Sequence, residues 1–425
     1  MHYTVNKIMV LMSLLLSMNV QADNDICKSA YLKKDFATAL KTCTPLARQG
    51  DAYAQTSLGS MYGNGDGVKQ DYSVALKWFR QAAEQGFARA QYDLGFAYAN
   101  GYGVQRNDKM ALKWFRLAAE QKYAPAQTSL GQMYANGQAV DKNDKEAMKW
   151  MRLAADQGDT LAQVFLGIMY NNGQGVVADH TQALKWLQLA AKKNDANAQS
   201  TIGNMYLLGH GVKQDYKKAM TWCRLAAAQG HVVAQFNLGL MYQHGLGVLK
   251  NNKEALKWYQ LSAVQGFGHA QTNLGVMYEK GQGVAPDILA AMKWYRKAAG
   301  QGDVLAQRYI ASVYAQGKSV PKDVDKAFKR YHLAAEHGDV ISQAYLGIAY
   351  TLGQGVKQDN KQAIKWDRLA ANKGNVTAEF NLGKMYENGW GVDKDSKMAL
   401  QWYRLAAEQG YEPAQQILSH SKELK

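Results

Sequence analysis

Apolar residues recur along this chain at helical spacing, in pairs of short segments that are separated by glycine-containing stretches. The stretch from Asp51 to Gly86 contains one such pair. Its first stripe consists of Ala54, Leu58, Met61 and Tyr62, and its second of Ala75, Leu76, Trp78, Phe79, Ala82 and Ala83. The pattern predicts two amphipathic helices joined by a loop.

The same stretch returns every 36 residues, without insertion or deletion, until ten copies end at Gly410. One glycine recurs in phase at Gly59, Gly95, Gly131, Gly167, Gly203, Gly239, Gly275, Gly347 and Gly383. One tryptophan recurs at Trp78, Trp114, Trp150, Trp186, Trp222, Trp258, Trp294, Trp366 and Trp402, so that only Trp390 lies outside the phase. A fixed period of this length predicts a solenoid, in which each unit buries its apolar face by stacking on its neighbours.

The loop of each copy has residues that end one helix and begin the next. Gly65 is glycine in every copy, as expected where a left-handed residue follows a helix end. Gly67 and Val68 complete the turn, and we expect the valine to fill the core beneath it. The position of Asp71 is always Asp or Asn, which predicts a side chain that caps the amides of the second helix. The small residues of that helix allow close approach, and we expect the tryptophan to fill the remaining space.

The eighth copy, Asp303 to Gly338, departs from the pattern. It has Ala311 and Ser319 at glycine positions, Arg330 at the tryptophan position and His332 at an arginine position. Because the largest apolar side chain is missing, we expect local opening to be easier there.

The motifs AQxxLGxMY, GxGV and ALKWFRxAAEQG, at Ala54–Tyr62, Gly65–Val68 and Ala75–Gly86, resemble the Sel-one-like repeat (SLR), a relative of the tetratricopeptide repeat. The resemblance covers residues 51–410. It implies an all-α fold, a right-handed superhelical α/α solenoid that acts as a protein-interaction scaffold. We expect one elongated domain, with residues 23–50 as a degenerate N-terminal capping helix pair and residues 411–425 as a C-terminal capping helix.

The first 22 residues have the features of a secretory signal peptide. Lys7 precedes the apolar run from Ile8 to Met18, and small residues up to Ala22 offer a cleavage site. The run is too short to span a bilayer, and no other apolar segment is long enough. We therefore expect an exported protein, in a bacterial periplasm or secreted, that does not span the membrane.

Two of the three cysteines, Cys27 and Cys43, fall on the two helices of the capping pair. In an exported protein this placement favours a disulfide, although two small buried thiols are the alternative. Cys223 takes the aromatic position after Trp222 and is interpreted as core filler.

The formal net charge is +15, which favours anionic partners. Many of the basic residues recur on the outer face of the second helix, where Arg80–Glu84 and Arg404–Glu408 are spaced for i, i+4 pairs. A solvated outer face, on which some of the basic residues are paired with acidic ones, is therefore another explanation of the net positive charge. The export signal disfavours nucleic acid.

No phosphate loop, nucleophile elbow or metal-ligand spacing occurs, so we predict no catalytic residue, metal site or cofactor. Two Ser-x-x-Lys tetrapeptides, Ser319–Lys322 and Ser419–Lys422, lack the companion motifs of penicillin-recognising enzymes. A cysteine-rich branch of the SLR family is associated with β-lactam binding or hydrolysis, but its cysteine pair in each repeat is missing here. A β-lactam hydrolase is therefore the least favoured function.

Positions that vary between copies of the first helix lie on one face, which lines the concave surface in related helical-pair solenoids. The aromatic and amide residues there are Tyr92, Phe96, Phe165, Phe236, Asn237, Asn273, Tyr309, Tyr345, Phe380 and Asn381. We predict that they bind a protein or peptide partner, and the alternative is that several pack against a neighbouring first helix.

The favoured function is thus an exported, non-enzymatic scaffold that binds a protein or peptide. The resemblance includes bacterial envelope and virulence-associated members, so envelope function and host interaction are both compatible. The alternative is a basic surface that binds an anionic envelope polymer, peptidoglycan or lipopolysaccharide.

Overall fold

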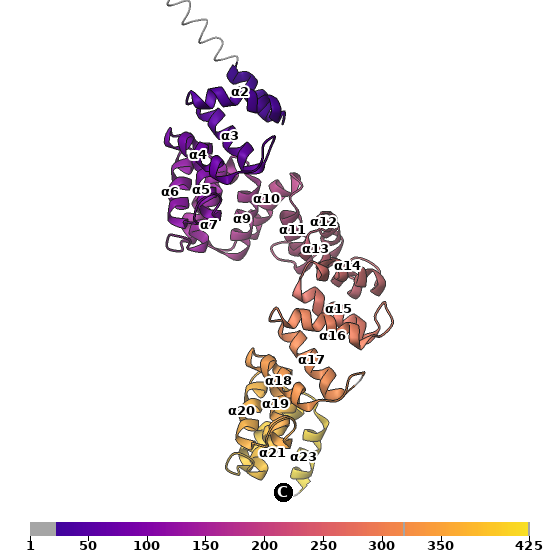
Figure 1. The fold of residues 1–425 in the computed structure, drawn as a ribbon. Helices are drawn as coiled ribbons and strands as arrows, with labels where there is room; N and C mark the ends of the chain where they lie inside the picture. The colour runs from indigo at the N-terminus through magenta and orange to yellow at the C-terminus, as the bar shows by residue number, and fades with distance from the viewer. Residues whose placement is uncertain (1–22, 318, 424–425) are drawn as a thin grey trace, which may run out of the picture. The chain divides into compact units, whose positions relative to one another are not determined.

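The computed structural model describes residues 23–317 and 319–423, and the regular elements within them are α-helices (Figure 1). The predicted signal peptide, residues 1–22, lies outside the described residues. Contacts divide the chain into two units, one up to Gln214 and the other from Asp215. The expected single elongated domain stays a prediction. Since each repeat packs mainly on the repeats beside it, the apolar side chains form a row of small cores.

Each repeat contains two helices, as the periodicity predicted. The first helices are α3 (Ala52–Asn64), α5 (Ala88–Asn100), α7 (Ala124–Asn136), α9 (Thr160–Asn172), α11 (Ala196–Leu208), α13 (Val232–His244), α15 (Gly268–Lys280), α17 (Val304–Gln316), α19 (Val340–Leu352) and α21 (Val376–Asn388). The second helices are α4 (Tyr72–Glu84), α6 (Asp108–Glu120), α8 (Asp144–Asp156), α10 (His180–Lys192), α12 (Tyr216–Ala228), α14 (Asn252–Val264), α16 (Ile288–Ala299), α18 (Val324–Glu336), α20 (Asn360–Ala371) and α22 (Ser396–Glu408). Within each unit, helices that follow one another along the chain pack together, and α3 also contacts α5. The fold is therefore an all-α solenoid of helix pairs.

A helix pair precedes the repeats and a single helix follows them. A helix over residues 23–32 is followed by α2 (Phe36–Arg48), and the sulfur atoms of Cys27 and Cys43 are bonded to each other between the two. Cys223 is a buried free cysteine in α12. The last helix, α23, spans Glu412–Glu423. Among the described residues, no helix is both long enough and apolar enough to cross a membrane.

The predicted helix ends are confirmed. Gly65 follows α3 in the left-handed conformation, with φ of 79°, and its N–H donates to the carbonyl of Met61. The carboxylate of Asp71 accepts from the N–H groups of Ser73 and Val74 at 2.9 and 3.0 Å.

The second glycine of the loop, in the repeats that have one, also allows the loop to lie close to the preceding repeat. At Gly103, which has φ of 68°, a Cβ atom would overlap the backbone of Tyr72 at the start of α4. The loop of one repeat thus lies directly on the second helix of the repeat before it. Ala139 and Ser319 occupy the equivalent position with φ of 59°, a conformation that is costly for residues other than glycine.

The in-phase glycine of the first helix receives a side chain from the second helix. A Cβ atom at Gly275 would lie 2.5 Å from the Tyr295 ring, so only glycine fits without displacement. The residues that face such a glycine come directly after the in-phase tryptophan: Phe79, Phe115, Met151, Leu187, Tyr259, Tyr295, Asp367 and Tyr403.

The tryptophan itself has a smaller part in the core than the sequence suggested. Trp186 and Trp366 are buried, but most of the in-phase tryptophans, including Trp258, are only half-buried. Tyr259, the next residue, is fully buried. Most of the tryptophans still pack against these cores as partly buried side chains, but the residue that lies against the glycine is the one that follows the tryptophan.

Buried glutamines connect successive repeats. The Nε2 group of Gln91 donates to the carbonyl of Ala83 at the end of α4, at 3.3 Å. Its Oε1 atom accepts from Gln121 at 2.8 Å. Since the last carbonyls of a helix have no partner within that helix, the glutamine stabilises the junction between repeats.

The recurrent arginine also connects repeats. Arg80 donates to the hydroxyl of Tyr98 in the next repeat at 3.3 Å, and Arg116 donates to Tyr134 at 3.1 Å. The expected i, i+4 pair of Arg80 with Glu84 is not among the ion pairs of the described residues. The prediction of that pair is wrong, because the guanidinium reaches across the repeat junction instead.

The eighth repeat replaces the missing tryptophan with polar contacts. Arg330 donates to the side chain of Gln307 at 2.9 Å, and Ala311 is buried at the glycine position. Tyr331 is still buried, and its ring stacks on that of Tyr345 with centroids 3.8 Å apart. Easier local opening of this repeat stays a prediction.

The glycine contact predicts a large difference between two alanine substitutions in the same helix. Gly275→Ala should destabilise the protein by about 1–3 kcal/mol, because the added methyl meets the Tyr295 ring. Gly268→Ala, also in α15, should be neutral or stabilising by about 0.5–1 kcal/mol, since nothing lies within 4 Å. Urea unfolding of both variants measures the difference, and equal midpoints would contradict this account of the contact.

Adjacent residues of α14 should also differ. Tyr259→Ala should cost about 3–5 kcal/mol, as truncations of fully buried aromatic side chains do. Trp258→Ala should cost about 1–3 kcal/mol, because the indole is only partly buried. Thermal and urea unfolding of the two variants test this order. A larger loss for Trp258→Ala would restore the tryptophan as the main core residue.

Asp367 should make stability depend on pH. Burial raises the pKa of Asp367 to about 8, and the amide of Asn381 opposes that rise only in part. Between the unfolded pKa of about 3.9 and about 8, the folded state keeps a proton that the unfolded chain releases. Stability should therefore fall, by on the order of a few kcal/mol, as pH rises through this window.

Asp367→Leu should abolish that fall, because Leu187 already fills the equivalent position against Gly167. Urea unfolding of the parent and the variant between about pH 5 and about pH 9 gives the comparison. A stability difference that stays constant over this range would show that the Asp367 carboxyl does not bind the proton.

Candidate functional site

Three pockets lie at the same place in the repeat. Each is formed by the end of one first helix, the loop after it, and the next first helix with its own loop. We name them after the residue of that last loop: the Tyr102 pocket, the Gln138 pocket and the Trp390 pocket. Their volumes are about 590, 330 and 500 Å³. The repeat therefore creates the pocket, and the variable residues decide its chemistry.

The Tyr102 and Gln138 pockets are neighbours in the first unit. The first lies between repeats one and two, the second between repeats two and three, and Phe96 lines both. We refer to these two adjacent pockets together as the first-helix groove.

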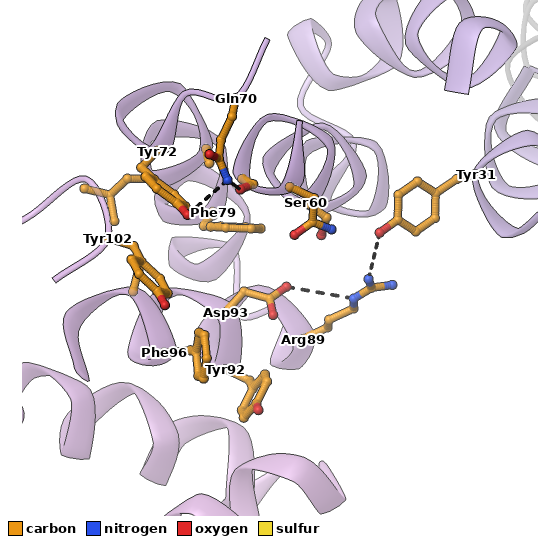
Figure 2. A pocket seen from close by; sticks show the side chains of 15 residues that line it. Tyr31, Ser60, Gln70, Tyr72, Phe79, Arg89, Tyr92, Asp93, Phe96 and Tyr102 are labelled. Atoms are coloured by element: carbon orange, nitrogen blue, oxygen red, sulfur yellow. Dashed lines mark hydrogen bonds and ion pairs between the residues drawn. The ribbon is translucent and has the colours of Figure 1, made fainter. Parts of the chain in front are cut away.

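Aromatic rings line one side of the Tyr102 pocket (Figure 2). The rings of Tyr72 and Tyr102 stack with centroids 4.8 Å apart. The Phe96 ring, which is 44% exposed, lies 6.0 Å from that of Tyr102 and 6.3 Å from that of Tyr92. This side offers partly exposed ring surface in a concave site, the usual character of a binding pocket.

A chain of polar contacts forms the opposite side. Figure 2 shows Arg89 between Asp93 and Tyr31. Its Nε atom lies 3.8 Å from the Asp93 carboxylate, and its Nη2 group donates to the Tyr31 hydroxyl at 3.1 Å. Burial raises the pKa of Asp93 to about 6, against the opposing charge of Arg89. The pocket thus has one cation and one anion.

The side chains of the pocket are held before any ligand binds. Gln70 donates both to the carbonyl of Gly63 at 2.8 Å and to the Tyr72 hydroxyl at 3.0 Å. Tyr31 lies on the helix over residues 23–32, one turn after Cys27, and the disulfide attaches this helix to α2. A fixed arrangement of this kind lowers the entropy that a ligand must overcome.

The residues that the sequence proposed for binding differ in their surroundings in the structure. Tyr92 and Phe96 line the Tyr102 pocket, and Asn381 lines the Trp390 pocket. Phe165 and Asn273 are half-buried, and none of the three pockets includes them.

The remaining residues pack inside the repeat array. Asn237 is buried, and its exposed fraction is only 4%. The ring pairs are Phe236 with Tyr259 and Phe267, Tyr309 with Tyr295, Tyr345 with Tyr331, and Phe380 with Tyr403 and Tyr411. Tyr309 and Tyr345 thus contact the preceding second helix, whereas Phe236 and Phe380 contact the following second helix and the turn after it. The contacts are with second helices and not with a neighbouring first helix, and a binding role for these four residues stays a prediction.

Sequence reasoning missed the loop and end residues of the pockets. Tyr72 and Tyr102 lie at a helix start and in a loop, outside the variable face of the first helices that supplied the candidates. Arg89 and Asp93 look like surface charges on a helix. The one visible signal was Trp390, the tryptophan outside the phase, which lines the pocket named after it.

Basic charge lies mainly away from the first-helix groove. In the Gln138 pocket, the charge of Arg106 is paired with Asp108 at 3.0 Å. Exposed lysines occupy the second helices instead, among them Lys77, Lys113 and Lys185. Among residues 23–317 and 319–423, no group of three His, Cys, Asp or Glu side chains could hold a metal ion.

The comparisons agree with this architecture. The Sel1 repeat family model matches ten consecutive segments, from 52–87 to 376–411. A protective antigen of uropathogenic Escherichia coli with an SLR fold is 39% identical, with a TM-score of 0.72 over 88% of this chain and 80% of that one. A Sel1 repeat protein from Oxalobacter formigenes is 36% identical, with a TM-score of 0.55 over 73% of this chain and 90% of that one. No curated protein matches at a significant level.

With ten repeats matched in sequence and two similar solved structures, this chain belongs to the Sel1 repeat family.

Proposed function

We propose that this protein is a non-enzymatic scaffold that binds an extended segment of a protein partner in the first-helix groove. The observation behind the proposal is the pair of adjacent pockets, Tyr102 and Gln138, in register with the repeat and joined at Phe96. Side chains of an extended peptide can enter successive pockets, while its backbone passes over Phe96. Partly exposed aromatic side chains in such a site are the usual anchors of protein interfaces.

The charge of the groove favours a protein partner over an anionic polymer. A phosphate or uronate polymer needs cations that are free to pair, but Arg89 already contacts Asp93 and Arg106 contacts Asp108. The exposed lysines of the second helices are separate from these pockets. Peptide side chains, by contrast, match a site that combines rings with one balanced ion pair.

We propose that this protein meets its partner outside the cytoplasm. The N-terminal 22 residues have the pattern of a signal peptide, and the capping pair has a disulfide, which persists in oxidising compartments. The uropathogenic Escherichia coli relative is described as a protective antigen, a description that fits exposure to antibodies. We therefore propose export to a bacterial periplasm or secretion, with an envelope or host protein as partner.

The test uses peptides that are selected from a random display library for binding to the full chain. Their affinity should weaken at least about tenfold with Phe96→Ala or Tyr102→Ala, because each removes part of the ring surface. Lys77→Ala and Lys185→Ala, on exposed second-helix positions, should leave the affinity within about twofold. Fluorescence anisotropy measures affinity, and circular dichroism verifies that each variant is folded.

Two results would contradict the proposal. One is a set of selected peptides whose affinity is unchanged by both aromatic substitutions. The other is binding that is lost with the lysine substitutions and declines steeply with salt, which would favour the anionic polymer on the second-helix face.

A further inference from the structure

The Asp93 carboxylate lines the Tyr102 pocket without a hydrogen-bond partner. Neither of its oxygen atoms accepts a hydrogen bond from any of the residues that the structure describes. Only the Oδ2 atom is buried, and the side chain as a whole is 22% exposed. The Oδ1 atom can therefore accept a hydrogen bond from a ligand in the pocket, as an ionised carboxylate requires when it is largely removed from water.

Arg89 compensates this carboxylate only in part. Its Nε atom is 3.8 Å from Oδ2 of Asp93, which is too far for a hydrogen bond. The guanidinium turns toward Tyr31 instead, because Nη2 donates to the hydroxyl at 3.1 Å and the central carbon lies 5.5 Å from the ring centroid. Burial consequently outweighs Arg89 and raises the pKa of Asp93 to about 6.

Aromatic rings surround the carboxylate. Figure 2 shows Phe79 on one side of it and Phe96 and Tyr92 on the other. The stacked rings of Tyr72 and Tyr102 extend this aromatic surface along the pocket. The face of an aromatic ring carries partial negative charge, so it attracts a cation and disfavours an anion. Rings and carboxylate together therefore favour a positively charged ligand group.

The repeat itself does not require this combination. Asp93 is the only acidic residue at its position, where the other copies have hydroxyl, amide or aromatic side chains: Ser57, Ser129, Phe165, Thr201, Asn237, Asn273, Tyr309, Tyr345 and Asn381. Phe96 is likewise the only aromatic residue at its position in the ten copies. Because the other copies form the same helix pair without them, the acid and the ring are specific to this pocket.

We propose that the Tyr102 pocket binds a positively charged side chain, lysine or arginine, of the extended partner segment. The inference rests on the proposed function, because the first-helix groove has to bind the segment that bears this side chain. The charged group donates to Oδ1 of Asp93, and the aliphatic part of the side chain lies against Phe96 and Tyr102. A volume of about 590 Å³ is sufficient for either side chain.

An acidic side chain is the less favoured occupant. It would place a second carboxylate beside Asp93, and Nη2 of Arg89 already donates to Tyr31. The net charge of +15 opposes a basic segment at long range. Salt screens that repulsion beyond about 8 Å at physiological ionic strength, so the groups that line the pocket decide the preference.

Three display libraries of peptides test the proposal on the full chain. They share random flanking residues without histidine and differ in one fixed central residue: lysine, leucine or glutamate. The lysine library should give binders whose affinity weakens at least about tenfold with Phe96→Ala. Synthetic versions of these binders with norleucine, which has no ammonium group, should bind the parent at least about tenfold more weakly than the lysine peptides.

Asp93→Asn should reduce that difference to about threefold or less, because it keeps the shape of the side chain and removes its charge. Asp156→Asn is the matched control, since it removes the same charge from an exposed position of α8. It should preserve the preference for lysine. Fluorescence anisotropy measures each affinity, and circular dichroism verifies that each variant is folded.

The affinity of the lysine peptides should also rise with pH. The Asp93 carboxyl, whose pKa is about 6, is mostly protonated at about pH 5 and ionised at about pH 7.5, so the affinity should increase at least about fivefold. Arg89 and its partner Tyr31 keep their protonation states over this range. Burial and the charge of Asp93 raise the pKa values of Tyr92 and Tyr123, which therefore stay neutral. Asp93→Asn should bind without this pH dependence.

The outcomes separate this inference from the proposed function. Binders from the leucine or glutamate library alone would overturn the charge preference, and so would equal affinity of the lysine and norleucine peptides. If such binders still lose affinity with Phe96→Ala, the first-helix groove remains a peptide site and only the preference for a cation is wrong. A lack of binders from all three libraries would contradict both proposals.

Discussion

The structure depends on one contact: a side chain from the second helix lies on a first-helix glycine with no Cβ atom between them. Tyr295 on Gly275 is an example, and the same arrangement recurs in repeats of both units. Because the contact fixes the approach of the two helices, it makes each repeat nearly identical in geometry. Asp367 on Gly347 shows how strict the arrangement is, since even a carboxyl is placed there in full burial.

Contacts between repeats extend this geometry along the chain. The loop glycine at Gly103 brings the loop onto the preceding second helix, and Gln91 connects the end of α4 with Gln121. Arg116 adds a hydrogen bond to Tyr134 of the next repeat. Since these contacts are polar and directional, they define the register between repeats more narrowly than apolar packing alone could.

The pockets follow from the same frame. In each of the three pockets, the loop lies on the preceding second helix, and the residue before its second-glycine position lines the space between two first helices. Tyr102, Gln138 and Trp390 all occupy that position, and their side chains differ completely. A regular array can thus have pockets of different chemistry at equivalent positions, with few substitutions and no change of fold.

The sequence alone determined the period, the helix pairs, the caps at Gly65 and Asp71 and the placement of Cys27 near Cys43, because all of these depend on local spacing. The sequence predicted that the tryptophan fills the space between the helices, because the size and recurrence of a residue do not show which of two adjacent residues points at the glycine. It proposed Phe236, Tyr309 and Phe380 for binding, but it could not show that their rings also pack against second-helix tyrosines. Only the tertiary structure decided these points and brought Tyr31, Arg89 and Tyr102 together, because residues distant in sequence meet there through contacts between repeats, which no local pattern records.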